Sequence, residues 1–203
     1  VAGMLSGKAG ILVAHMSNGE KGLQLINQVF EETDIPIRTI RPTHVNRKEE
    51  LLMEAFEYAQ NGGLIDLTCG SNNELSPGKV IQRAESLGVP LENITISSDG
   101  YGSWSRYDEY DNMIEIGASQ VSSLYQEFKT MVLNLGFDLE KALKFFTTNV
   151  SKSLGLYPQK GTIMEKSDAD LIIIDDNFEI ETVIAKGNLM MEEGKLIKKG
   201  TYE

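Results

Sequence analysis

Residues 64–97 read LIDLTCGSNNELSPGKVIQRAESLGVPLENITIS and have the pattern of a β-strand, an α-helix and a second β-strand. The apolar runs at 64–68 and 94–97 have the length of buried strands. Between them, Ser76-Pro77 is a typical helix start, because serine is favoured at the N-cap and proline at the first helical position. Gly88 is a typical helix end. The stretch therefore predicts a βαβ unit with parallel strands.

The same alternation of strand and helix signals occurs before this stretch. Strands are predicted at 11–15 and 39–44, and helices at 23–30 and 48–60, where apolar residues recur at helical spacing. Up to about residue 100 the chain thus predicts four strands separated by amphipathic helices, which is the pattern of an α/β fold. Four such units correspond to half of an eight-stranded (β/α)8 barrel.

The pattern changes after the fourth strand. Residues 99–115 predict a long loop, and helices are predicted at about 118–135 and 138–154. Beyond Pro158, short strands joined by hairpin turns are predicted at 172–174, 182–186, 189–191 and 196–198. The sequence therefore predicts two units: half of a barrel with connecting helices at 1–157, and a β-strand unit at 158–203.

Composition argues against several classes of protein. The 203 residues carry a formal net charge of −11 with no basic stripe, which argues against a nucleic-acid partner. No apolar run approaches the roughly 20 residues that span a bilayer, and no signal segment is recognisable, so no membrane partner is predicted. The single cysteine, Cys69, cannot form an internal disulfide and fits a reducing cytoplasm. These features favour a cytoplasmic protein that acts on small molecules.

Three side chains that can bind metal ions stand at the ends of predicted strands: His15, His44 and Asp99. Active sites of α/β barrels lie at the carboxyl ends of the strands, so the two histidines would face one barrel mouth from adjacent strands. Imidazole is a common ligand of zinc-class metals, and a carboxylate can both bind a metal and act as a general base. The competing interpretations are histidines hydrogen-bonded to the backbone and an ordinary Asp-Gly turn. The shared placement of all three residues favours metal binding.

Two further residues are candidate substrate contacts. Arg47 follows His44 by three residues, where a guanidinium could bind a substrate carboxylate through two hydrogen bonds, although a solvated arginine fits equally well. Ser103 stands in a glycine-rich segment, where hydroxyl and amide groups could contact a ligand. Cys69 has no third histidine to activate it, so a packed thiol is predicted.

Four stretches of the chain carry a family resemblance. They are SGKAG at 6–10 followed by His15-Met16, PTHVNR at 42–47, SSDGYGS at 97–103, and KGTI at 160–163 followed by DADL at 168–171. Together the first three closely resemble isoaspartyl dipeptidases of the amidohydrolase superfamily. The fourth resembles the segment by which chains of that superfamily return from a barrel to a β-sandwich.

The resemblance implies the C-terminal half of a (β/α)8 TIM-type barrel, strands five to eight, followed by a short β segment of a composite β-sandwich. It also implies a zinc-dependent metallopeptidase that hydrolyses β-aspartyl (isoaspartyl) dipeptides, with two zinc ions in each complete site. His15 and His44 match histidines that hold the second metal. Asp99 matches an aspartate that binds the first metal and carries the proton from the attacking hydroxide to the leaving amine. Arg47 and Ser103 match positions that bind the dipeptide.

The other metal ligands of these enzymes, a His-x-His pair and a carboxylated lysine, would lie upstream of Val1. We therefore expect a fragment that is inactive alone and whose open half-barrel exposes two strand edges. Such edges predict a homo-oligomer or association with a missing N-terminal half. Two alternatives stay open. One is an amidohydrolase that acts on cyclic amides, similar to hydantoinases or dihydroorotases, and the other is a non-catalytic half-barrel that binds a metal or a partner.

Overall fold

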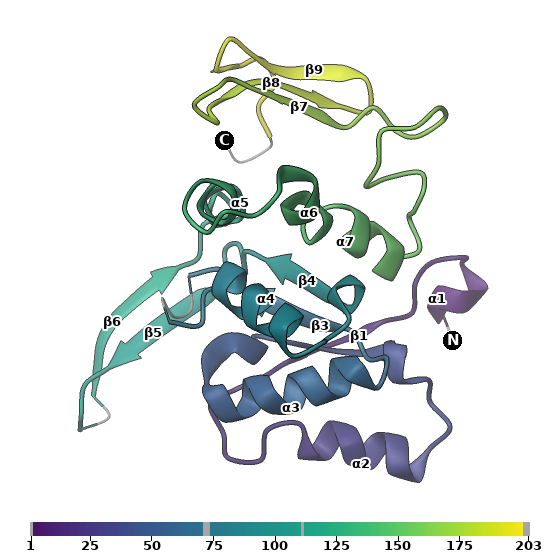
Figure 1. Ribbon diagram of the computed structural model, residues 1–203, viewed down its shortest axis with the longest axis vertical. Helices are drawn as coiled ribbons and strands as arrows, with labels where there is room; N and C mark the ends of the chain where they lie inside the picture. The colour runs from purple at the N-terminus through teal and green to yellow at the C-terminus, as the bar shows by residue number, and fades with distance from the viewer. Residues whose placement is uncertain (1, 71–73, 111, 201–203) are drawn as a thin grey trace.

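The structure is a computed structural model that describes residues 2–70, 74–110 and 112–200 (Figure 1). Its helices are α1 (Ala2–Leu5), α2 (Gln24–Glu32), α3 (Glu49–Gln60), α4 (Pro77–Ser86), α5 (Ser123–Leu133), α6 (Leu139–Lys144) and α7 (Thr148–Ser153). Its strands are β1 (Leu12–His15), β2 (Ile40–Thr43), β3 (Ile65–Thr68), β4 (Ile94–Ser97), β5 (Ser103–Tyr107), β6 (Met113–Ala118), β7 (Leu171–Ile174), β8 (Ile180–Ala185), β9 (Asn188–Glu192) and β10 (Lys195–Leu196). Three short 3-10 helices are η1 (Ile37–Thr39), η2 (Val45–Arg47) and η3 (Leu91–Asn93).

The mixed α/β fold predicted from the sequence is confirmed for the first hundred residues. Strands β1 and β2 pair in parallel, as do β3 and β4, and β2 lies beside β3. Helices α2 and α3 lie where the apolar spacing predicts them, α4 lies between the predicted start Ser76-Pro77 and the predicted end Gly88, and the three helices connect the successive strands. The four strands thus form two parallel pairs, and side-chain bonds between the ends of β2 and β3 bring the carboxyl ends of the pairs to one region of the molecule.

The two faces of β2, β3 and β4 differ in polarity, because successive side chains along a strand point to opposite faces. One face packs into the core with residues of α3 and α4 through Ile40, Ile65, Leu67, Ile94 and Ile96. The opposite face carries buried polar side chains: Arg41, Thr43, Asp66, Thr68 and Thr95. The polar face leads to the strand ends at which the candidate ligands stand.

Helix α2 has a cap that comes from the neighbouring helix. The N-cap residue Leu23, directly before the helix, donates its backbone N–H to the Glu54 carboxylate of α3 at 2.7 Å. Gly22 has a φ of 46°, and a Cβ built on it would lie 2.3 Å from Glu54 Oε2. Glycine is therefore required at this position for the carboxylate to reach the helix end and fasten α2 to α3.

The loop predicted at 99–115 is wrong for about half of its length, which forms strands. Strands β5 and β6 pair in antiparallel fashion and form a hairpin that projects away from β3 and β4, to the lower left in Figure 1. Arg106 and Glu115 form an ion pair across the hairpin at 2.8 Å, and the Asp108 carboxylate accepts backbone N–H groups in the turn. Almost every residue of both strands is exposed, so the alternation of buried and exposed positions that marks a strand is absent there.

The single helix predicted at 138–154 is also wrong, because the chain breaks it into α6 and α7. At the break, Phe145 accepts the backbone N–H of Ile96 at 3.2 Å, and Asn149 Nδ2 donates to the backbone oxygen of Ile94 at 2.9 Å. These bonds cover the edge of β4 that faces away from β3. We expected two open strand edges, but the edge of β4 is covered by these two hydrogen bonds.

The predicted C-terminal strands are confirmed as a four-stranded antiparallel sheet in the order β10-β9-β8-β7. The sheet lies next to α5 (Figure 1), where Tyr125 Oη donates to the backbone oxygen of Phe178 at 2.8 Å and Lys129 pairs with Glu179 at 2.6 Å. Lys160 pairs with Asp168 at 2.9 Å and also with Asp170, which fastens the preceding segment to this sheet. The division of the chain at 157/158 stays a prediction. Within the described residues, no helix has the length and apolar character needed to cross a bilayer.

Candidate metal centre

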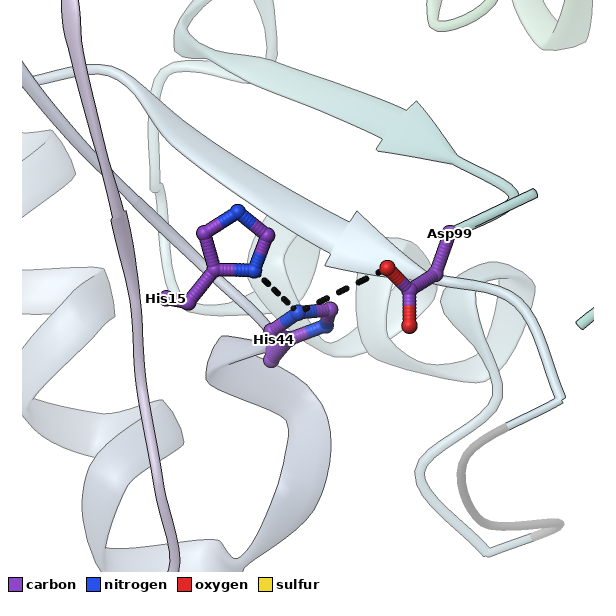
Figure 2. Close-up of side chains that lie close together, drawn as sticks. All are labelled: His15, His44 and Asp99. Atoms are coloured by element: carbon purple, nitrogen blue, oxygen red, sulfur yellow. Dashed lines mark hydrogen bonds and ion pairs between the residues drawn. The ribbon is translucent and has the colours of Figure 1, made fainter. Parts of the chain in front are cut away.

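The three predicted ligands His15, His44 and Asp99 come together at the strand ends (Figure 2). His15 Nδ1 and His44 Nε2 lie 2.9 Å apart, and His44 Nε2 lies 3.9 Å from Asp99 Oδ1. One ligand atom from each of the three side chains lies within 4.8 Å of the other two. The joint placement that the sequence predicted is thus present in the structure.

The backbone at two of these residues adopts a conformation that few side chains tolerate. His44 has a φ of 63° directly after β2, and Asp99 has a φ of 52° two residues after β4. Aspartate and histidine are among the non-glycine residues found most often in this left-handed region. Backbone strain of this kind concentrates at functional sites, and here it turns each side chain at the point where its strand ends.

A hydrogen bond determines the orientation of the His44 ring. Nδ1 lies 2.7 Å from Thr68 Oγ1, and the side chain is buried, so Nε2 is the nitrogen that faces His15 and Asp99. Burial and then the charge of Arg47 lower the pKa of His44, while Asp99 acts in the opposite direction. A neutral imidazole is the form that binds a metal ion.

Asn46 fastens the segment after His44 to the end of β3. Its Oδ1 accepts the backbone N–H of Thr68 at 2.9 Å, and its Nδ2 donates to the backbone oxygen of Thr68 at 3.0 Å and to that of Leu75 at 2.9 Å. The sequence analysis identified neither Asn46 nor Thr68 as functional. Asn46 stands inside the PTHVNR stretch, which was the one available signal, whereas Thr68 looks like any strand residue.

Gly102 determines how closely the chain approaches Asp99. Its backbone N–H donates to the backbone oxygen of Asp99 at 2.8 Å, and a Cβ built on it would lie 2.7 Å from Asp99 Cγ and Oδ1. Ser119 closes the base of the loop, because it accepts the N–H of Tyr101 and donates its own N–H to the oxygen of Gly102, both at 2.9 Å. The Asp-Gly segment is therefore a tight turn and also holds a candidate ligand.

Comparison with known proteins identifies the family. Residues 38–190, about three quarters of the chain, match the sequence pattern of the amidohydrolase family. The chain belongs to the amidohydrolase family. The matched residues include His44, Arg47, Asp99 and Ser103, whereas His15 lies before them.

Among solved structures, this amidohydrolase chain is similar to the β-aspartyl dipeptidase of Fervidobacterium islandicum AW-1. The structure of that enzyme in complex with the dipeptide β-Asp-Leu superposes on this chain with a TM-score of 0.89, and the two sequences are 36% identical. The match covers 98% of this chain and 52% of the dipeptidase chain. A second structure of the same dipeptidase is 35% identical in sequence to this chain and has a TM-score of 0.83. The match covers 98% of this chain and 50% of the dipeptidase chain. The chain therefore spans about half the length of these relatives.

A more distant structure shares the fold alone. The atrazine chlorohydrolase of Arthrobacter aurescens TC1, complexed with zinc, is 12% identical with a TM-score of 0.57, and the match covers 99% of this chain and 48% of that one. Its similarity shows that the two chains share a fold over the region that carries His15, His44 and Asp99.

The two predicted substrate contacts lie on the surface of this amidohydrolase chain. Arg47 is the exposed last residue of η2, and Ser103 is the exposed first residue of β5. Arg47 is near enough for its charge to lower the pKa of His44. Cys69 is buried as predicted, and burial raises the pKa of its thiol to about 12, which makes it a poor source of thiolate.

The donor set fits a zinc-class metal. Two imidazole nitrogens and one carboxylate oxygen are ligands that zinc takes in proteins, and three protein ligands are typical of catalytic zinc sites. His44 is buried and Asp99 is half-buried, whereas His15 is exposed, so solvent reaches the cluster from one side. With Nε2 directed at the metal, Nδ1–H of His44 would donate to Thr68 Oγ1, which is the kind of outer contact that orients a metal-binding histidine.

Proposed function

We propose that the chain forms part of a zinc-dependent β-aspartyl dipeptidase. The observation that carries the proposal is the convergence of His15, His44 and Asp99 in a chain 36% identical to a β-aspartyl dipeptidase. In this proposal β1 to β4 are strands five to eight of a (β/α)8 barrel, and β7 to β10 belong to a composite β-sandwich. The activity belongs to the complete enzyme, because the chain spans about half of its relatives.

His15 and His44 would hold one of the two zinc ions, and Asp99 would bind the other. Bound zinc would lower the pKa of a water molecule and polarise the scissile carbonyl of the substrate. Asp99 then acts as the general base: its carboxylate accepts the proton of the attacking water and transfers it to the leaving amine. The position of Asp99 Oδ1, 3.9 Å from His44 Nε2, supports this role.

Arg47 and Ser103 would bind the dipeptide. A β-aspartyl dipeptide has free carboxylates beside its isopeptide bond, and a guanidinium binds such a group through two parallel hydrogen bonds. Arg47 supports this role because its side chain is exposed three residues beyond His44. Ser103 directly follows Gly102, which lies against the Asp99 carboxylate, so its hydroxyl is close along the chain to the reacting groups.

The 203-residue chain by itself is proposed to be inactive. The cluster at the strand ends holds three metal-binding side chains, which suffice for one zinc ion and not for two. We further propose that the chain associates with an N-terminal half or with copies of itself. The exposed Leu12 and Val13 on β1 support association, because apolar side chains on an edge strand favour pairing with another chain.

Hydrolysis of β-Asp-Leu by the complete enzyme tests this function, with α-Asp-Leu as the comparison substrate. We expect hydrolysis of the β-linked dipeptide and a fall of about 10²- to 10⁴-fold in kcat for Asp99→Asn, which removes the general base. Arg47→Ala should raise KM for the dipeptide. Efficient hydrolysis of hydantoin instead of β-Asp-Leu, or full activity of Asp99→Asn, would overturn the proposal.

A further inference from the structure

A buried carboxylate lies beneath the candidate metal centre and has no role in the proposed reaction. Asp66 stands in the middle strand β3 and is 6% exposed. Its Oδ2 accepts the hydroxyl of Thr43 at 2.7 Å and that of Ser97 at 2.5 Å, and its Oδ1 accepts the hydroxyl of Thr95 at 2.6 Å. One side chain therefore joins β2, β3 and β4.

The two oxygens of Asp66 have different neighbours along the chain. Thr43 directly precedes His44, and Ser97 stands two residues before Asp99. Both of these hydroxyls bind the same atom, Oδ2. Thr95, which binds Oδ1, is further from either ligand in sequence. Oδ2 thus connects the two strand ends that carry ligands, whereas Oδ1 binds the middle of β4.

A carboxylate is a costly way to fill this position. Burial raises the pKa of Asp66, while the three hydroxyl hydrogen bonds act in the opposite direction. Replacing a buried charged group and its partners with well-packed apolar side chains is often neutral or stabilising. The positive charge of the neighbouring buried Arg41 also lowers the pKa of Asp66, although the Nε and Nη2 atoms of Arg41 have no hydrogen-bond partner among the described residues. Stability alone therefore does not account for Asp66.

We propose that Asp66 is a positioning residue: its Oδ2 holds the ends of β2 and β4 at the separation at which His44 and Asp99 face each other across the metal centre. This inference rests on the proposed metal site. Asp66 acts through Thr43 and Ser97, whose hydroxyls donate to it. A bond from one rigid acceptor to both strand ends limits their relative movement, as partners behind metal ligands do.

Zinc affinity of matched variants tests the role of Asp66. Asp66→Asn and Thr43→Val should weaken zinc binding by the chain by about 10- to 100-fold, which is the usual effect of removing a partner behind a ligand. Thr95→Val is the control, because it removes an equally buried hydroxyl from the same carboxylate and has the same shape change as Thr43→Val. It should change zinc affinity by less than about threefold. The double variant Asp66→Asn/Thr43→Val should bind zinc about as tightly as Asp66→Asn does, since both substitutions remove the same connection between Thr43 and Asp66.

The metal-free chain gives a second readout. It contains two histidines, so nuclear magnetic resonance signals of the imidazole rings can be assigned with His15→Ala. Asp66→Asn should shift the ring signals of His44 although residue 66 is not its sequence neighbour, and Thr95→Val should leave them in place. Equal effects of Asp66→Asn, Thr43→Val and Thr95→Val on zinc affinity and ring signals would overturn the positioning role. If the addition of zinc left the ring signals of the unmodified chain unchanged, the metal site would be overturned instead. The spectra of the metal-free variants would still decide whether Asp66 positions His44.

Discussion

Nδ1 of His44 lies 2.7 Å from Oγ1 of Thr68, and this contact directs the other ring nitrogen toward His15 and Asp99. Thr68 ends β3, and His44 follows the end of β2, so the bond joins two neighbouring strand ends. Asn46 reinforces the same junction through the backbone of Thr68. The orientation of His44 therefore depends on residues that need not touch a metal ion.

Replacing Thr68 with valine tests this dependence. Thr68→Val keeps the shape of the side chain and removes the oxygen that orients the His44 ring, so zinc affinity should fall by about 10- to 100-fold. Thr68→Ser is the control, because it keeps the hydroxyl. Isothermal titration of zinc into each variant measures the effect. Equal affinities for Thr68→Val and the unmodified chain would show that this hydrogen bond does not orient the ligand.

Gly102 offers a test of the position of Asp99. In Gly102→Ala the new Cβ would lie 2.7 Å from the Asp99 carboxylate, so the carboxylate must move. A displacement of about 1 Å at a reacting group can cost 10²-fold in rate, and we expect a loss of this size in β-Asp-Leu hydrolysis by the complete enzyme. Gly10→Ala is the control, since a Cβ there meets no heavy atom within 4 Å. Activity of Gly102→Ala equal to that of Gly10→Ala would contradict the proposed role of Asp99.

Glu127 predicts a pH dependence of stability. Its carboxylate on α5 accepts the backbone N–H of Gly78 in α4 at 2.8 Å, and burial raises its pKa above the unfolded value of 4.5. The folded state therefore favours the protonated carboxyl. Its contribution to stability is fully present below pH 4.5 and is lost as the pH rises through the folded pKa.

The variant Glu127→Gln keeps a carbonyl acceptor for Gly78 and removes the titration. The free energy of unfolding of Glu127→Gln relative to the unmodified chain should thus increase from pH 4 to pH 7, as measured by urea unfolding at each pH. A relative stability that is constant over this range would show that Glu127 ionises as easily in the folded chain as in the unfolded one.

The sequence predicts the features that depend on local pattern. Strands β1 to β4 follow from apolar runs, helices α2 and α3 from apolar spacing, and α4 from its start and end signals. His15, His44 and Asp99 were found because they stand where strands end. Features that depend on contacts between distant residues were missed. The break between α6 and α7 accompanies the bond of Phe145 to Ile96, and the hairpin β5–β6 has almost no buried positions to reveal it.

The polar residues behind the ligands could not be predicted for the same reason. Asp66 and Thr68 are polar residues between apolar ones, Asn46 begins a polar run, and the partners of all three lie more than twenty residues away. A buried polar side chain acquires its role from what the fold brings to it. By contrast, the strand-end position of His44 is visible from the chain alone.

Zinc binding by the 203-residue chain tests the central claim most directly. Titration at neutral pH, followed by elemental analysis, should give one zinc ion per chain, and His44→Ala should weaken binding by more than about 100-fold because it removes the buried ligand. Cys69→Ser is the control and should bind zinc as the unmodified chain does, since the buried thiol is not part of the cluster. A chain that binds no zinc, or that binds it equally well after His44→Ala, would contradict the account.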